Sequence, residues 1–596
     1  MKLLINKKIS VLFILLVIII GGCKKENNLL YISEKSVVLG ANIGLEHLVR
    51  YETNATSVQI IIPEDASDWC SAETVKGELI KITATPNLSL NENRTTKLTI
   101  KAGNAIPQTI NIMQLSVKET VQKKLLSFIL PANLNQLKTD ITGIINDDNG
   151  TITIETNQWI ENAKHLIARF ETFANVYVNE MQQESGITEN SYLTDLVFTM
   201  KSEDGTEKQY TVITKGAMFT GLPVISINID ENKEVVEKTE KLSSVMSLLA
   251  PDNDAFDMFS EMIIIRGRGN TTWDMPKKPY RIDFSEKTSV FGLPAAKKWV
   301  LLANYQDPTL LMNDVTFELG QRFDVEYTHA SIHVELFING NYRGNYQLTE
   351  QNEIGKGRVN IDKKQGFLLE MDAYFDEDYK FKTNYFQLPV MITDPDLNNE
   401  SEMEPIKLFI QNFENSLFSP GFPNNNYEEY TDVNSLIDFM LVNEIVKNAE
   451  LYHPKSIYCY KDTDTKIKWG PLWDFDWAFS YNSVQKNYFG DSKGVLFKKG
   501  TIGNYPGIQF FNRFMEIPEF RAKYKSRWNE VKPQALSILS YIDTKKQQLD
   551  KSQTENFKLS EAIPPTKTTT YNNLITQMKQ FLADRINYLD AEINKF

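Results

Sequence analysis

The sequence predicts a multidomain protein in which two all-β sandwiches precede a larger α+β domain. Short alternating apolar and polar runs fill the N-terminal third, the composition changes after Leu222, and a helix, polar loop, hairpin and acidic motif follow one another from Ile437 to Trp477. A chain of 596 residues is long enough for several domains. Its 42% hydrophobic and 24% charged residues are typical of folded domains rather than disorder.

The net charge of the chain is -13. Nonspecific binding to nucleic acid requires a basic surface, so the charge argues against nucleic acid as a partner. It excludes no enzymatic function.

The N-terminus has the three parts of an export signal. Lysines at positions 2, 7 and 8 precede an apolar run from Ile9 to Ile20, and Gly21-Gly22-Cys23 follows. The run is too short for an ordinary transmembrane helix, and Cys23 after two glycines resembles a bacterial lipobox. We therefore expect residues 1–22 to be a lipoprotein signal peptide, Cys23 to be lipidated, and the protein to be lipid-anchored in the cell envelope. The alternatives are cleavage by ordinary signal peptidase or a retained membrane anchor.

The other two cysteines, Cys70 and Cys459, fall in different predicted domains. A disulfide framework is therefore not expected despite the export signal. We expect Cys459, between two tyrosines, to be a small residue on a packed strand.

After a linker at 23–30, the first sandwich is predicted over 31–117. Its strands are expected at 58–62, 79–83 and 97–100, separated by Asn, Pro and Gly. The motifs Asp68-Trp69, Asn93-Arg94-Thr95 and Ile110 to Gln114 resemble a BACON-type, immunoglobulin-like domain. The resemblance implies a spacer or a module that faces carbohydrate. Without a cluster of exposed aromatic residues we favour a spacer, and a glycan stays a possible partner.

The second immunoglobulin-like sandwich is predicted over 118–216. Strands are expected at 152–154, 166–170 and 209–213, with a hairpin at Asp204-Gly205.

The domain predicted over 217–596 begins with features of a nucleotide-binding lobe. An apolar strand ends in Gly267-x-Gly269-Asn270, and glycines of this kind let backbone amides approach phosphate. A basic strand containing Lys278 and Arg281 follows. A helix is then expected at 309–322, a hairpin around Asn339-Gly340, and after it Glu350 at the position of a kinase hinge.

The second half of this domain contains the acidic motif. A buried helix is expected from Ile437 to Val446, a polar loop with Glu450 and Lys455 follows, and a hairpin leads to Asp474-Phe475-Asp476. On an extended chain the two aspartates share a face while the phenylalanine points into the core. Magnesium prefers such hard oxygen ligands, and the order of the parts is that of a protein-kinase catalytic centre. An acidic surface turn is the alternative for the motif by itself.

Several separate motifs resemble the CotH (spore coat protein H) kinase family, in particular its Bacteroidetes lipoprotein branch, over roughly 222–596. They are Ile265 to Trp273 with Pro276 to Tyr280, Trp299 to Tyr305, Asn339 to Tyr346, Arg358 to Ile361, Leu368 to Asp372, His453 to Ser456 and Trp473 to Trp477. The resemblance implies an atypical protein-kinase-like fold. It also implies ATP-dependent phosphorylation, with Mg or Mn, of secreted or envelope proteins.

The resemblance implies a role for each matching residue. Asp474 and Asp476 are the metal ligands, and Glu450 and Lys455 occupy the catalytic loop, where family members commonly have an aspartate and then an asparagine. The nucleotide-binding residues are Gly267, Gly269, Asn270, Lys278, Arg281 and Glu350. Family members often have a lysine at the position of Asp283, so the cation that pairs the phosphates is left open between Lys278, Arg281 and a residue elsewhere.

Two hypotheses therefore remain. The protein is either an active exported kinase or a catalytically degenerate kinase fold that acts as a binding or scaffold lipoprotein, because a lysine at position 455 does not hold a second metal ion. A further acidic cluster, Glu370, Asp372 and residues 376–378, is interpreted as a solvated loop, with calcium or a basic substrate as the alternatives.

Overall fold

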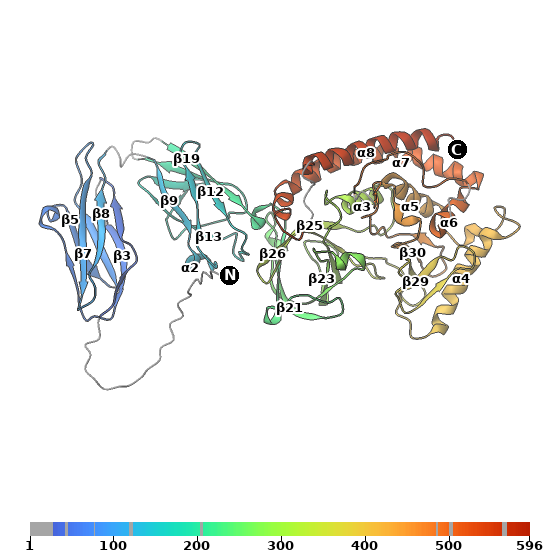
Figure 1. The fold of residues 1–596 in the computed structure, drawn as a ribbon, viewed down its shortest axis with the longest axis horizontal. Helices are drawn as coiled ribbons and strands as arrows, with labels where there is room; N and C mark the ends of the chain where they lie inside the picture. Colours follow the sequence, from blue (N-terminus) through green and yellow to red (C-terminus); the bar gives the residue numbers. More distant parts are fainter. Residues whose placement is uncertain are drawn as a thin grey trace, which may run out of the picture. The chain divides into compact units, whose positions relative to one another are not determined.

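The computed structural model describes residues 28–41, 46–76, 78–117, 123–202, 207–483, 487–499, 505–562 and 569–596. An N-terminal all-β region with several sheets is followed by a region that contains both sheets and long helices, which confirms the predicted fold class (Figure 1). The predicted signal peptide, Cys23 and the hairpin at Asp204-Gly205 lie outside the described residues.

The first β region is a sandwich of two four-stranded sheets, ordered β1-β3-β6-β5 and β2-β8-β7-β4. Alternating apolar residues, among them Val49, Ile80 and Ile100, form its core together with Trp69, over which the guanidinium of Arg94 lies. The strands are β1 (Leu30–Ile32), β2 (Ser36–Leu39), β3 (Glu46–Thr53), β4 (Val58–Ile61), β5 (Cys70–Val75), β6 (Leu79–Ala84), β7 (Arg94–Ala102) and β8 (Gln108–Gln114).

The second β region contains sheets ordered β10-β9-β14, β11-β12-β19-β18-β15-β16 and β13-β17. The single strand expected at 166–170 is divided into β13 and β14 at Ala168. The elements are β9 (Leu125–Leu130), α2 (Ala132–Asn135), β10 (Ile141–Thr142), β11 (Ile144–Asn146), β12 (Thr151–Glu155), β13 (Leu166–Ile167), β14 (Arg169–Thr172), β15 (Asn175–Val178), β16 (Met181–Gln183), β17 (Glu189–Asn190), β18 (Leu196–Lys201) and β19 (Glu207–Lys215).

A closed seven-stranded barrel, ordered β20-β21-β22-β23-β24-β26-β25, follows. The parallel pairing of β20 with β25 closes it, and the other neighbouring strands are antiparallel. Ile265, Ile282 and Trp299 are part of its core. The strands are β20 (Val224–Ile229), β21 (Leu242–Leu249), β22 (Met258–Gly267), β23 (Tyr280–Thr288), β24 (Ala296–Leu302), β25 (Ser331–Ile338) and β26 (Asn341–Glu350).

One helix, α3 (Met312–Arg322), lies between β24 and β25 in the chain. The helix begins three residues later than expected because the carboxylate of Asp307 accepts hydrogen bonds from the amides of Thr309 and Met312, at 2.8 and 2.7 Å, and so forms the turn before it. The predicted hairpin turn is also present, with Asn339 and Gly340 both at positive φ.

The remaining residues form a second lobe around a sheet ordered β28-β29-β27-β30-β31. Helix α5 is buried from Leu436 to Val446, and the long helices α7 and α8 lie side by side (Figure 1). The elements are β27 (Phe367–Met371), β28 (Lys380–Lys382), β29 (Pro389–Asp394), α4 (Glu400–Phe418), α5 (Val433–Val446), β30 (Ile457–Lys461), β31 (Lys468–Trp469), α6 (Pro506–Phe514), α7 (Pro518–Asn556) and α8 (Tyr571–Ile593).

Two further observations concern the cysteines and the helices. Cys70 and Cys459 are both buried and free, as expected. Within the described residues, every helix is either too short or too polar to cross a membrane.

Candidate active site

A cavity of about 460 Å³ lies where the barrel meets the second lobe. Segments that are distant in the sequence line it: the Gly267–Asn270 turn, strand β23, strand β27, the loop after α5 and the acidic motif. Eight of the predicted site residues line the cavity: Gly267, Gly269, Asn270, Arg281, Glu450, Lys455, Asp474 and Asp476.

The turn after β22 requires both of its glycines. A Cβ atom at Gly267 would overlap the ring of Trp273, and one at Gly269 would overlap the hydroxyl of Thr272. Gly269 also has a φ of +86°, which other residues rarely adopt. The turn therefore brings backbone to the cavity wall where side chains would otherwise fill the space.

Side chains at the tip of this turn connect it to the loop after β27. The side-chain Nδ2 of Asn270 donates to the carboxylate of Asp376 at 3.1 Å, and its side-chain oxygen accepts from Lys238 at 3.2 Å. The hydroxyls of Thr271 and Tyr374 contact each other. The Gly turn thus covers one side of the cavity and is held to the second lobe.

The two aspartates of the acidic motif face the cavity, and Phe475 between them is buried, as the alternation predicts. Asp474 has a φ of +59°, a backbone strain of the kind found at functional sites. Burial raises the pKa of Asp474, and burial with the nearby charge of Asp474 raises the pKa of Asp476 well above its usual range.

These carboxylates fit a divalent cation. Among the described residues no group of three or more His, Cys, Asp or Glu side chains is placed to hold a metal ion. Asp474 and Asp476 are a pair of carboxylates in the cavity wall. Magnesium commonly takes one or two carboxylates and fills its other positions with water and phosphate oxygens. The Oδ1 atom of Asp476 is buried without a hydrogen-bond partner, as expected for an oxygen that a cation would satisfy.

Glu450 lies in the short 3₁₀ turn Ala449–Leu451, which Asn448 caps by accepting from the amide of Glu450 at 3.1 Å. Its side chain is only 6% exposed, and the Oε2 atom lacks a hydrogen-bond partner. Burial and then the charge of Asp474 raise the pKa of Glu450 to about 8. A carboxyl group in this state exchanges a proton near neutral pH, as a general base requires.

Lys455 lies beside these groups. Its ammonium lies over the rings of Trp477 and Tyr374, 4.6 and 5.0 Å from their centroids. The pKa of Glu450 and that of Asp474 are both raised by burial, and the charge of Lys455 offsets part of each rise. The position therefore provides a positive charge where the resembled family commonly has an asparagine.

Two predicted nucleotide-binding residues are not brought to the cavity. The ammonium of Lys278 donates to the carbonyl of Trp273 at 2.6 Å and lies over its ring. Glu350 is buried and forms an ion pair with Arg358. Arg281 does line the cavity, but Asp283 on the same strand face holds its guanidinium at 2.8 Å.

Other cavity residues were not singled out as site residues from the sequence. Arg268 lies between the two glycines, and the side-chain carbonyl of Asn313 accepts a hydrogen bond from the amide of Phe475 at 3.0 Å. Burial and then Asp372 raise the pKa of Glu370 to about 8. The sequence predicts Glu370 and Asp372 to be part of a solvated loop. In the structure both line the cavity, and Asp372 is buried.

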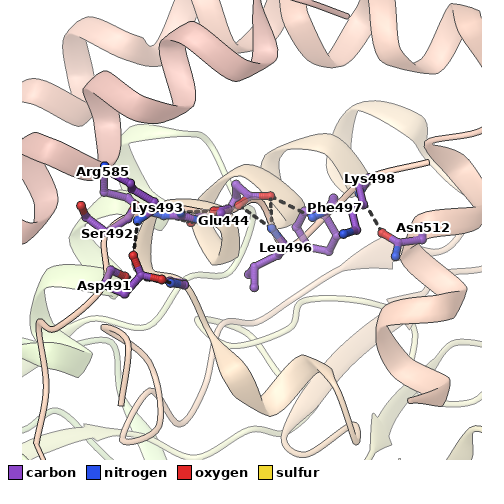
Figure 2. A network of polar contacts seen from close by, with 11 residues as sticks. Glu444, Asp491, Ser492, Lys493, Leu496, Phe497, Lys498, Asn512 and Arg585 are labelled. Carbon is purple, nitrogen blue, oxygen red and sulfur yellow. Dashed lines mark hydrogen bonds and ion pairs between the residues drawn. The ribbon is translucent and has the colours of Figure 1, made fainter. Parts of the chain in front are cut away.

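The segment after the acidic motif is fastened to α5 and α8. The buried carboxylate of Glu444 accepts from the amides of Leu496 and Phe497, at 2.8 and 3.1 Å, and pairs with Arg585 at 2.5 Å (Figure 2). Arg585 also donates to the carbonyls of Ser492 and Gly494. One buried ion pair therefore positions the chain between the acidic motif and α6.

A strand barrel with a glycine turn, facing two carboxylates that follow a buried helix and a hairpin, defines a kinase-like domain. The chain belongs to the CotH kinase protein family, whose model matches residues 265–589, more than half of its length. A model described as a putative N-terminal binding domain, BACON, matches residues 59–115. The two matches confirm the resemblance to the CotH kinase family and to a BACON-type domain.

Comparison with curated proteins found no match. Among solved structures, extracellular cadherin domains 1–5 of protocadherin gamma B2 are 8% identical over 43% of this chain and 57% of theirs, with a TM-score of 0.14. An endo-fucoidan hydrolase of glycoside hydrolase family 107 is 12% identical over 32% of this chain and 34% of its own, with a TM-score of 0.14. The chain thus spans less than two thirds of either protein.

Proposed function

We propose that this protein is an exported lipoprotein that transfers a phosphoryl group from ATP, with Mg or Mn, to Ser or Thr hydroxyls of secreted or envelope proteins. The observation that carries the proposal is the cavity itself, which brings the Gly267–Asn270 turn to Asp474, Asp476 and Glu450. The charged start, the apolar run and Cys23 support export and a lipid anchor.

Each group has a role in phosphoryl transfer. Backbone amides of the Gly turn would donate to phosphate oxygens, and Asp474 and Asp476 would hold the divalent ion. The ion, when bound, neutralises the charge on the phosphate oxygens. Glu450 would orient the acceptor hydroxyl and take its proton, which requires the deprotonated carboxylate.

Lys455 limits the site to fewer ions than a typical kinase holds. Its ammonium has only donors and therefore repels a second cation instead of binding it. The two rings that surround it hold this charge beside Glu450 and Asp474, where it favours their ionised forms. We expect one tightly bound divalent ion.

A transfer assay with the full chain tests the proposal. The protein is incubated with ATP labelled in its γ-phosphate, Mg or Mn, and a mixture of Ser- and Thr-containing peptides, and Asp474→Asn serves as the inactive control. Label on a peptide or on the protein itself supports the proposal. Nucleotide binding without transfer to any acceptor contradicts it and favours the second candidate.

The second candidate is a catalytically degenerate kinase fold that acts as a binding or scaffold lipoprotein in the envelope. Lys455 at the usual second-metal position and Asp283 at a usual lysine position favour it, as does the match to a putative binding domain. Glycan or protein partners would then bind without nucleotide. Two results together would support this candidate: the protein binds to a glycan array, and ATP does not change its melting temperature.

A further inference from the structure

We propose that Arg268 is the side chain that binds the phosphates of the nucleotide in this cavity, in place of a strand lysine. This inference rests on the proposed function, since it assumes that a nucleotide occupies the cavity. The sequence leaves this cation open between Lys278, Arg281 and another residue, and Lys278 does not line the cavity.

The other cations of the cavity wall are placed differently. Arg281 pairs with Asp283 at 2.8 Å, and Lys238 donates to Asn270. Arg266 lies 4.0 Å from the carboxylate of Asp283, and its buried Nε atom has no hydrogen-bond partner in the described part of the chain, but Arg266 is on strand β22 and not on the turn. Lys455 also forms no hydrogen bond or ion pair within the described residues, but two aromatic rings hold its ammonium in the catalytic loop, where its charge acts on Glu450 and Asp474. The guanidinium of Arg268 lies on the Gly turn and forms no hydrogen bond or ion pair with any residue in the described part of the chain, so its donors are left for a ligand.

The protein nevertheless holds Arg268 in place. Its backbone amide donates to the carbonyl of Pro279 at 3.3 Å, and the flanking glycines set the turn. Its guanidinium lies over the ring of Trp473, 5.4 Å from the centroid. Trp473 is itself buried against Phe317 and His329. Stacking on an aromatic face orients a guanidinium without using its N–H donors.

The surroundings of Arg268 match a metal-bound polyphosphate. Asp474, the residue after Trp473, lies near enough to favour the charged guanidinium, as does Glu370. Neither carboxylate pairs with it directly. An anion that bridges the guanidinium and a cation held by Asp474 would therefore be bound from both sides, and the planar fork of arginine suits two phosphate oxygens.

Positions 281 and 283 of strand β23 are an arginine and an aspartate, and neither is a lysine. Residues 281 and 283 share a face of β23, and Arg266 on β22 is the register partner of Arg281. At the position where family members often have the lysine, Asp283 pairs with Arg281 and lies 4.0 Å from Arg266. Strand β23 contributes no lysine to the cavity wall, whereas Arg268 on the turn has no ion-pair partner in the described part of the chain.

The test measures nucleotide affinity by calorimetry, with the full chain and Mg present, for ATP, ADP and AMP. Arg268→Gln should weaken ATP and ADP by about 10- to 100-fold, since a charge-assisted phosphate contact is lost, and AMP much less. Arg268→Lys should give an intermediate loss, because the charge remains but the fork does not. Arg343→Gln serves as the matched control, because this arginine of β26 pairs with Glu234 away from the cavity. The Arg343→Gln variant should bind all three nucleotides with the affinity of the wild type.

Three results would overturn the inference. If Arg281→Gln weakens ATP while Arg268→Gln binds as the wild type does, the phosphate cation is Arg281 and the proposed function still holds. If Arg268→Gln weakens ATP, ADP and AMP equally and melts at a lower temperature without ligand, Arg268 only braces Trp473. If the wild type binds none of the three nucleotides, both the inference and the proposed function fail.

Discussion

The side-chain carbonyl of Asn313, in the first turn of α3, accepts a hydrogen bond from the backbone amide of Phe475 at 3.0 Å. Both groups are buried, and Phe475 separates the two candidate metal ligands. Helix α3 therefore positions the acidic motif directly.

Asn313→Ala should consequently impair both folding and the site. The amide of Phe475 loses its partner, which should lower the free energy of unfolding by about 1–3 kcal/mol, and affinity for ADP with Mg should fall because the aspartates lose a support. Urea unfolding and calorimetry measure the two effects. Gln321→Ala, which removes one hydrogen bond to the carbonyl of His329 at the other end of α3, should reduce stability alone. Equal ADP affinity in both variants would contradict the positioning role.

Phosphoryl transfer should increase with pH through about 8 if Glu450 is the general base. Burial and the charge of Asp474 raise the pKa of Glu450 to about 8, so the carboxyl is mostly protonated at pH 7 and gains its basic form as the pH rises. Rates between pH 6 and 9 at saturating ATP and Mg measure this. Glu450→Gln should abolish the pH-dependent rise. A profile that is flat from pH 6 to 9 in the wild type would remove Glu450 from the base role.

The sequence predicts the local parts of the site because they depend on neighbouring residues. The spacing of Asp474 and Asp476, the glycines at 267 and 269, and the helix and hairpin before the acidic motif are all short-range patterns. The direction of a charged side chain depends instead on partners far along the chain. Lys278 is turned away by the carbonyl of Trp273, and Glu350 is withdrawn by Arg358, so neither reaches the cavity.

Closure of the barrel is a second feature that local patterns do not predict. It depends on the parallel pairing of β20 with β25, more than a hundred residues apart. The same long-range packing buries Asp372 and places Glu370 in the cavity wall, although the two carboxylates look in the sequence like part of a solvated loop.

The stability of the protein should depend on pH through Glu335, which is fully buried in β25. Burial raises its pKa to about 7, so between pH 4.5 and 7 the folded state binds more protons than the unfolded state. The contribution of Glu335 to the free energy of unfolding is therefore greatest below pH 4.5. It falls by up to about 3 kcal/mol as the pH rises to about 7. Glu335→Gln should flatten this decline in urea titrations at pH 5 and 7.

A neighbouring lysine supplies the opposite slope. Burial lowers the pKa of Lys277 to about 7, so above that pH the folded state binds fewer protons and stability rises. Glu335→Gln should leave this rising limb in place. Glu234→Gln, a change at an exposed carboxylate, serves as the control and should leave both limbs unchanged. A decline between pH 5 and 7 that persists in Glu335→Gln would assign it to other groups.

Breaking the buried pair between Glu444 and Arg585 should be severely destabilising. Arg585 is fully buried, and Arg585→Ala leaves the carboxylate of Glu444 without its counter-charge (Figure 2). The free energy of unfolding should fall by about 3–5 kcal/mol. On the same helix, Lys579→Ala removes an exposed pair with Asp543 and should cost less than about 1 kcal/mol. Comparable losses in both variants would show that Glu444 tolerates its unpaired charge.

The substitution Asp474→Asn distinguishes two roles for Asp474, that of a metal ligand and that of a structural hydrogen-bond acceptor. The change removes a charge but keeps the size, so binding of ATP with Mg should weaken by at least about tenfold. Without metal, the melting temperature should hold or rise, because the nearby carboxylates of Asp474, Asp476 and Glu450 repel one another. Asp464→Asn, in the exposed turn between β30 and β31, is the matched control and should change neither quantity. A lower metal-free melting temperature together with unchanged ATP affinity would identify Asp474 as a structural hydrogen-bond acceptor instead of a ligand.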